Sequence, residues 1–203
     1  MNSPEISLPE PVTRKHRGRQ RCVETQKAIL SATINLLKEK TLREVTADSI
    51  ALRAGVSKAT IYKWWPNKSL VALDAFLSRM QSAVETPDTG SAAKDFIEQI
   101  KALLRFFKTP YGKIYAQFIT EGQSDPAFLI EFRERFLQLR RDDVRVMWQR
   151  GVDRGDIRSD VDGDIVLDLI YGAIIFRLLT GHAPLNDRQA EAIVMTAFRG
   201  LQT

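Results

Sequence analysis

The 203-residue sequence predicts an all-α protein. Apolar residues recur at spacings of three and four along most of the chain, and no run alternates apolar and polar residues as a half-buried strand does. Proline, glycine and small polar residues separate these segments at 86–90, 122–126, 151–163 and 181–184. Apolar residues make up 44% of the chain, which is enough to bury a substantial core.

The charge is divided unevenly along the chain. Residues 1–68 contain 13 of the 30 Lys and Arg and 6 of the 25 Asp and Glu, which leaves 17 and 19 for the remaining residues. The basic excess therefore lies in the first third, and it indicates an anionic partner for that part. We expect a mobile basic arm over 1–22, a compact head over 23–69, a connecting helix over 70–88 and a larger helical domain over 89–203.

The expected arm ends in a cluster of basic residues directly before the first long helix. A solvated terminus without a partner is the plain interpretation of such a cluster. Its position before a helical hairpin favours an arm that reaches phosphates or the minor groove of DNA. The arm residues expected to contact DNA are Arg17, Arg19 and Arg21.

Residues 45–68, VTADSIALRAGVSKATIYKWWPNK, predict two short helices joined by a glycine turn. Thr46 can cap the first helix, Gly55 can end it, and Ser57 can cap the second. A hairpin of this size, with basic and polar residues on one side of its second helix, is typical of a DNA-reading helix-turn-helix.

So short a hairpin cannot bury its own inner face, and helix 24–40 is expected to pack behind it. The small core predicted for this head consists of Leu37, Val45, Ile50, Val56, Ile61 and Trp65. Asn67 is expected to cap a fourth helix that runs to about Glu85. Beyond it the pattern predicts helices at about 91–107, 111–121, 126–153, 162–180 and 186–201.

The second helix of the hairpin carries the residues expected to read DNA. Lys58, Ala59 and Thr60 occupy its first turn, the end that usually enters the major groove. Lys63 and Lys68 are expected to hold phosphates by charge and placement, with solvated surface lysines as the alternative. Thr46 is either a plain helix cap, a phosphate contact at a helix N-terminus, or both.

The segment 45–71 resembles the DNA-binding signature of the tetracycline-repressor (TetR) family of bacterial transcriptional regulators. The preceding TQKAILSATINLLKEK also resembles the first helix of that family, so that the match covers about residues 24–73. The resemblance implies that Tyr62 and Trp64 donate hydrogen bonds to backbone phosphates. Trp64 departs from the histidine often found there, and its burial against the first helix is the alternative. The second half is similar to the family in size and all-helical layout.

Aromatic residues crowd the segments after residue 90, and a stripe of aromatics at helical spacing is core more often than pocket. The resemblance nevertheless implies a ligand cavity there. Its mostly apolar walls suggest a small hydrophobic or aromatic effector. Tyr115 and Trp148 are preferred because they offer a polar group from an apolar wall. The lining residues expected are Phe96, Leu103, Tyr111, Tyr115, Phe118, Phe132, Trp148 and Phe176.

Helix 162–180 is apolar around much of its circumference, and the last helix has a matching face. Deep burial within one chain is one explanation. The resemblance implies instead a four-helix bundle with a second copy, and such a homodimer suits a palindromic operator in double-stranded DNA. The interface residues expected are Leu169, Ile170, Ala173, Ile174, Ile193, Val194 and Ala197.

Catalytic and metal-binding patterns are not found in the sequence. The lone Cys22 excludes an internal disulfide and any multi-cysteine metal site, and neither His16 nor His182 belongs to a catalytic or metal spacing. We therefore expect no enzyme, cofactor or metal. Without a signal peptide or membrane span, the cytoplasm is the expected compartment.

Two functions remain open from the sequence. One is a ligand-released repressor that binds a palindrome as a homodimer. In the other, the hairpin docks proteins or has an architectural role, or the chain regulates transcription without a small molecule.

Overall fold

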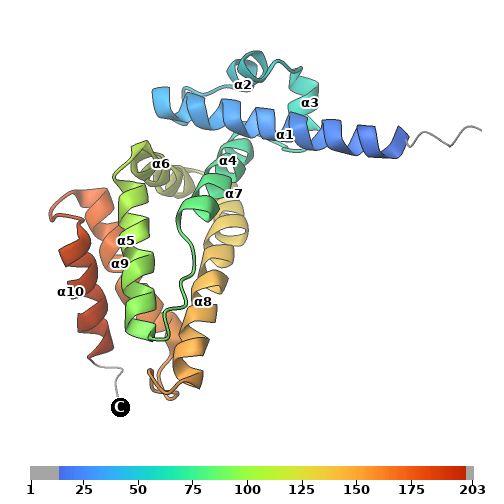
Figure 1. Ribbon diagram of the computed structural model, residues 1–203. Coiled ribbons are helices and arrows are strands. Elements are labelled where there is room, and N and C mark those ends of the chain that lie inside the picture. Colours follow the sequence, from blue (N-terminus) through green and yellow to red (C-terminus); the bar gives the residue numbers. More distant parts are fainter. Residues whose placement is uncertain (1–13, 200–203) are drawn as a thin grey trace, which may run out of the picture.

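The structure is a computed structural model that describes residues 14–199, with side chains from residue 22 onward. All regular structure in this part of the chain is helical, which confirms the predicted all-α class (Figure 1). No helix in it is long and apolar enough to cross a membrane.

Three helices form the head at one end of the molecule (Figure 1): α1 (Arg14–Glu39), α2 (Ala47–Ala54) and α3 (Lys58–Tyr62). Helix α1 begins at Arg14 and not at Glu24, so the backbone from Arg14 belongs to this helix and not to a separate arm. The side chains of Arg17, Arg19 and Arg21 lie outside the described residues.

The expected caps of the hairpin are present. Thr46 Oγ1 accepts a hydrogen bond from the Ser49 backbone N–H at 3.1 Å, and Ser49 Oγ accepts one from the Thr46 N–H at 3.1 Å. Gly55 ends α2 with a φ of 66°, a left-handed conformation that glycine adopts without strain. Ser57 Oγ caps α3 by accepting from the Thr60 N–H at 3.2 Å. These hydrogen bonds fix where each hairpin helix begins, and Gly55 forms the turn between the two helices.

The head closes over the core predicted for it. Five of its six predicted residues are at most 4% exposed, and Val56 is half-buried against them. Trp65 also satisfies its polar atom, because its Nε1 donates to Asp74 Oδ2 at 2.7 Å. This bond joins the end of the hairpin to the next helix.

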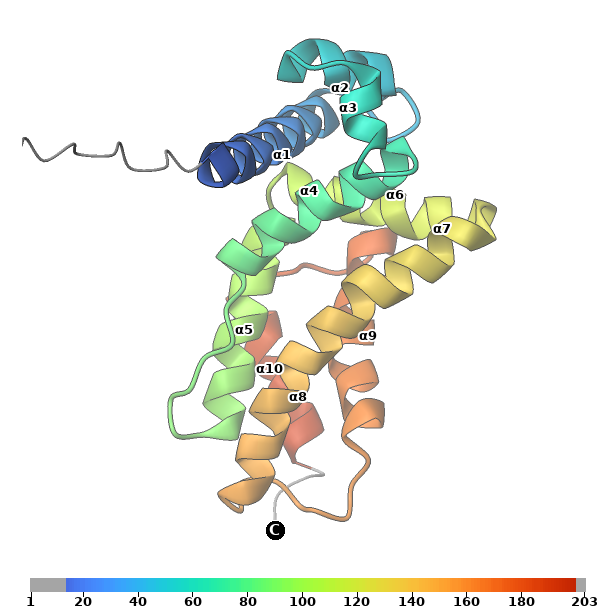
Figure 2. The ribbon, with the colours of Figure 1, turned by 90° about the vertical axis from the view of Figure 1, so that its right-hand side faces the viewer.

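Helix α4 (Lys68–Ala83) connects the head to the body, and Figure 2 shows it running obliquely between them. Asn67 Oδ1 caps it as predicted, accepting from the Leu70 N–H at 3.0 Å. One face of α4 packs on α1. Further along the same helix, Phe76 and Met80 are buried in the core of the body, where Phe76 packs on aromatic rings. The helix is therefore shared between the two parts.

The body contains α5 (Ala92–Phe107), α6 (Pro110–Ser124), α7 (Pro126–Glu131), a π-helical segment η1 (Phe132–Leu137), α8 (Gln138–Asp153), α9 (Gly163–Thr180) and α10 (Asp187–Phe198). Helices α7, η1 and α8 follow one another without a break, as predicted for 126–153. The π turn was not predicted. Phe132 and Phe136 in it stack with ring centroids 5.2 Å apart, and both are buried.

Helix α6 lies beneath the head and contacts it directly. Gln117 Oε1 accepts a hydrogen bond from the Leu42 backbone N–H at 2.6 Å, and Arg43 Nε lies 3.4 Å from Glu121 Oε2. Because Leu42 precedes α2, these contacts tie the base of the hairpin to the body.

Ion pairs tie α8 to the start of α9. The guanidinium of Arg145 donates to both carboxylate oxygens of Asp164, at 3.0 and 2.9 Å. Gly163 lies directly against Trp148, because a Cβ at residue 163 would come within 2.7 Å of Trp148 Nε1. The close approach of these two helices fixes one end of the body.

Candidate nucleic-acid interface and ligand cavity

Helix α3 presents a polar face to solvent and an apolar face to the head. Lys58, Ala59 and Lys63 are exposed, and the Tyr62 side chain is 50% exposed beside them. Ile61, on the opposite side, is fully buried. The expected reading residues therefore lie on one accessible side of a rigidly capped helix.

Lys58 is held by an acidic neighbour. Its Nζ lies 3.0 Å from Asp48 Oδ1 in the first turn of α2. The hydrogen bond to Asp48 raises the pKa of Lys58, so the ammonium keeps its charge at neutral pH. Both side chains are exposed, and the pair can therefore rearrange when a phosphate or a base edge approaches.

Two hydroxyl groups at the N-terminus of α3 form a hydrogen bond with each other. Ser57 Oγ and Thr60 Oγ1 are 2.9 Å apart, and Thr60 is half-buried. Thr60 thus supports the helix start and has less of its surface available than Lys58 or Ala59. Thr46 is exposed and caps α2, so the predicted cap is present and its side chain remains accessible.

The Trp64 side chain is partly buried against the head. Its ring meets Trp65 edge to face at 5.9 Å, and it is half-buried against the core of the head. The Lys63 ammonium lies 5.9 Å from the Trp64 ring centroid, within the range of a cation–π contact. Trp64 therefore provides a platform beside Lys63.

Lys68 has a different place from the one predicted. Its Nζ donates to three backbone carbonyl oxygens of the loop between α1 and α2, those of Leu42 at 3.0 Å, Arg43 at 2.9 Å and Val45 at 2.6 Å. An ammonium group has three N–H donors, and all three are used here. This corrects the expectation that Lys68 holds a phosphate, because its charge ties the loop to the start of α4.

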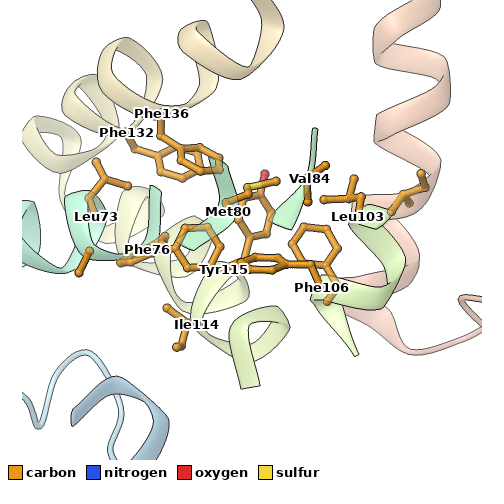
Figure 3. Packing of buried hydrophobic residues seen from close by; sticks show 14 of the residues in the cluster. Leu73, Phe76, Met80, Val84, Leu103, Phe106, Ile114, Tyr115, Phe132 and Phe136 are labelled. Carbon is orange, nitrogen blue, oxygen red and sulfur yellow. The ribbon is translucent and has the colours of Figure 1, made fainter. Parts of the chain in front are cut away.

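A cavity of about 380 Å³ lies in the body. Of the predicted lining residues, Leu103, Tyr115 and Phe132 border it. Figure 3 shows Tyr115 and Met80 between the rings of Phe132 and Phe136 on one side and Leu103 on the other. Five helices and the π turn contribute to the wall, whose residues are Met80, Val84, Gln99, Leu103, Phe107, Tyr115, Ile119, Phe132, Phe136, Leu137, Arg140, Arg141, Val144, Leu167, Asp168, Tyr171, Gly172 and Ile175.

Three other predicted lining residues are core residues outside this wall. Phe96 packs on Phe198 with ring centroids 5.5 Å apart, and Phe118 packs on Phe76 at 5.4 Å. Trp148 fills the space against Gly163. The expectation that these three rings meet a ligand is corrected, because other parts of the chain cover them.

Two further predicted residues lie on other sides of the body. Tyr111 stacks on Phe106 with centroids 4.7 Å apart and borders a separate, more open hollow. Phe176 is 60% exposed on α9 and does not border the cavity. Both are therefore also removed from the predicted lining.

The polar residues of the cavity wall were not among the predicted ligand residues: Gln99, Arg140, Arg141, Asp168 and Tyr171. Gln99 on α5 is 1% exposed, and its Oε1 accepts a hydrogen bond from the Tyr171 hydroxyl of α9. Gln99 Nε2 has no partner in the described part of the chain. The available signal was a glutamine that interrupts the apolar stripe of α5 between Phe96 and Leu103.

The apolar residues that α9 exposes are mostly not the ones predicted for the interface. Of the expected interface residues, Leu169 is 63% exposed, whereas Ile170, Ile174 and Val194 are fully buried in their own chain. These three are corrected to core residues. Ala173, Ile193 and Ala197 are half-buried. The large apolar side chains that α9 does expose are those of Ile165, Leu169, Phe176 and Leu179.

A capped two-helix hairpin with an exposed basic second helix, carried on an all-helical body, defines a helix-turn-helix DNA-binding regulator. Residues 29–73 match the model for bacterial regulatory proteins of the tetR family, and residues 86–197 match that for the tetracyclin repressor-like C-terminal domain. The chain belongs to the TetR family of transcriptional regulators.

Individual relatives agree with this assignment. The chain is 44% identical over 186 residues to the HTH-type transcriptional regulator YdeS of Bacillus subtilis, covering 92% of this chain and 94% of YdeS. The crystal structure of the TetR family transcription regulator SCO0332 superposes with a TM-score of 0.79 at 30% identity, covering 89% of this chain and all of that one.

A more distant structure shares the fold. The transcriptional regulator FadR of Bacillus subtilis, solved in complex with stearoyl-CoA, superposes with a TM-score of 0.65 at 16% identity and covers 86% of this chain and 98% of its own. At this identity the likeness concerns the architecture alone.

Proposed function

We propose that the protein is a repressor that binds a palindromic operator as a homodimer in the cytoplasm and is released by a small molecule. The single observation that carries the proposal is the exposed side of α3 and of the residue that follows it, where Lys58, Ala59, Tyr62 and Lys63 stand free of the head core. The proposed roles are base-edge contacts for Lys58 and Ala59 and phosphate contacts for Tyr62, Lys63 and Thr46.

The exposed apolar residues of α9 support the homodimer. Ile165, Leu169, Phe176 and Leu179 recur at spacings of four, seven and three, so they share one side of the helix. Three of them are at least 60% exposed. A two-fold copy packed against this side would bury them and would place a second head for the other half of a palindrome.

The cavity supports release by a ligand. Met80 and Val84 in its wall lie on and just after α4, the helix that begins under the hairpin. A ligand that prefers one position of α4 shifts the population of head orientations in proportion to that preference. FadR, which shares this architecture, was solved with stearoyl-CoA bound, and this supports a fold that can accept a ligand with an apolar acyl chain.

A mobility-shift series with DNA fragments that flank the protein's own gene tests the proposal. We expect at least one fragment to be retained at low salt, with an affinity that falls steeply as salt rises, because phosphate contacts release counterions. Folded protein that retains none of them contradicts operator binding. Retention that is unchanged when Lys58 and Tyr62 are both replaced by Ala favours a hairpin that docks protein instead.

A further inference from the structure

One buried donor in the cavity wall lacks an acceptor. Gln99 is 1% exposed and borders the cavity, and its Nε2 has no hydrogen-bond partner in the described part of the chain. Native proteins pair nearly all of their buried polar groups, because an unpaired N–H loses its hydrogen bonds to water without compensation. An acceptor supplied from the cavity would remove this cost.

The hydrogen bond to the neighbouring tyrosine involves the oxygen of the Gln99 amide. The Tyr171 hydroxyl donates to Gln99 Oε1, and burial raises the pKa of Tyr171, so the hydroxyl keeps its proton. Since Tyr171 uses the oxygen of the amide, the NH2 group is the part that remains for a ligand. The cavity therefore offers a neutral donor.

The charged side chains of the wall are already matched. Arg140 Nη1 donates to Asp143 Oδ2 at 2.9 Å, and Arg141 pairs with Asp168 and, at 3.2 Å, with Asp164. A carboxylate ligand would lose its hydration here and gain no unpaired cation. The balance of charge favours an uncharged ligand.

The rest of the wall is apolar, and four of its side chains are aromatic. Phe107, Tyr115, Phe132 and Phe136 contribute rings, and aliphatic side chains fill most of the remaining surface. A volume of about 380 Å³ lies within the range of roughly 300–1,000 Å³ that is usual for small-molecule sites. A compact apolar molecule with a single acceptor matches this combination.

We infer that the cavity binds an uncharged, largely apolar molecule whose carbonyl oxygen accepts a hydrogen bond from Gln99 Nε2. This rests on the proposed function, in which an effector occupies the cavity, and it adds the chemical class of that effector. Gln99 selects the carbonyl group, and the apolar wall accommodates the remainder of the molecule.

Three compounds of similar shape test the inference. Benzophenone has an uncharged carbonyl, diphenylmethane lacks the acceptor, and diphenylacetate carries a carboxylate. Binding of each to the full-length protein is measured by calorimetric titration without DNA. The test variant combines Gln99→Leu with Tyr171→Phe, because leucine alone would leave the Tyr171 hydroxyl free to take over as donor. Gln123→Leu, an exposed position on α6, is the matched control.

We expect the wild-type protein and Gln123→Leu to bind benzophenone about tenfold more tightly than diphenylmethane, and diphenylacetate more weakly than benzophenone. In the double variant the ratio of benzophenone to diphenylmethane affinity should fall to about one, with its own thermal transition showing that it is folded. A wild-type ratio near one, an unchanged ratio in the double variant, tightest binding of diphenylacetate, or no binding of any compound would overturn the inference.

These results are independent of the DNA experiment. Selective binding of benzophenone together with no retained DNA fragment would refute the repressor and leave the carbonyl site standing. Retained DNA with no carbonyl selectivity would refute the site and leave the repressor standing.

Discussion

Asp48 and Lys58 form an ion pair of 3.0 Å between the first turns of the two hairpin helices. The lysine is the residue we propose to reach a base edge, and the aspartate belongs to the helix before it. In the DNA-free protein the Asp48 carboxylate therefore pairs with the Lys58 ammonium, the group that we propose to contact the operator. Binding has to exchange this partner for one on DNA.

Removing the carboxylate is expected to strengthen binding to DNA in general. Asp48→Asn frees the Lys58 ammonium and deletes a negative charge beside the residues proposed to contact DNA. The affinity for an unrelated DNA fragment should rise, and the dependence on salt should become steeper by about one ion. Fluorescence anisotropy titrations at several salt concentrations measure both quantities.

Lys58→Ala is the complementary change. It should lower operator affinity about tenfold or more and reduce the preference for the operator over unrelated DNA, because the base contact is lost. If Asp48→Asn and Lys58→Ala change the DNA affinity by the same amount and in the same direction, the proposed exchange of partners is contradicted.

Lys68 and Lys63 are expected to respond oppositely to the same substitution. Lys68→Ala removes the donor that joins three loop carbonyls and should lower the free energy of unfolding by about 1–2 kcal/mol. Lys63→Ala should leave stability nearly unchanged and weaken DNA binding across sequences, with a shallower salt dependence. Urea unfolding and anisotropy titrations separate the two. Equal stability of both variants would refute the structural role of Lys68.

Local contacts in the head can be predicted from the sequence, whereas the contacts of Lys68 cannot. The caps of Thr46, Ser57 and Asn67 involve partners three residues away, so local pattern predicts them. The acceptors of Lys68 lie 23 to 26 residues earlier in a loop, and only tertiary structure brings them together. Lys68 follows the helix proposed to read DNA, and the sequence pattern alone therefore indicated a phosphate contact.

The lining of the cavity could likewise be predicted only in part, because its residues lie far apart in the sequence. Aromatic composition indicated Tyr115 and Phe132, but Gln99 and Tyr171 are 72 residues apart and look ordinary in the sequence. In α9 the apolar residues cover most of the circumference, so periodicity cannot distinguish the buried Ile170 from the exposed Leu169. The helices themselves were predictable because their start and stop signals are local.

Charge placed on the exposed side of α9 should separate the proposed homodimer. Phe176→Glu puts a carboxylate where the side chain is 60% exposed in the single chain, so the fold of the chain should persist while the interface does not form. Sedimentation velocity is expected to show a monomer, and operator affinity should fall because two heads no longer bind together.

The matched control for this change is Leu52→Glu, an apolar residue of the head that is 86% exposed and remote from α9. It should leave the sedimentation coefficient of the dimer unchanged. A dimer that survives Phe176→Glu would show that the second copy packs elsewhere.

The contact between α6 and the head gives a last prediction. Gln117 Oε1 accepts from the Leu42 N–H at 2.6 Å, and Leu42 is 3% exposed. Gln117→Leu leaves this buried donor unpaired and should cost about 1–3 kcal/mol of unfolding free energy. Gln117→Glu keeps an acceptor oxygen in place and should remain close to the wild type in urea unfolding. Since neither substitution touches the α3 face, the salt dependence of DNA binding should stay the same for both. A Gln117→Leu protein as stable as Gln117→Glu would mean that this hydrogen bond contributes little, and that the other contacts hold the head on α6.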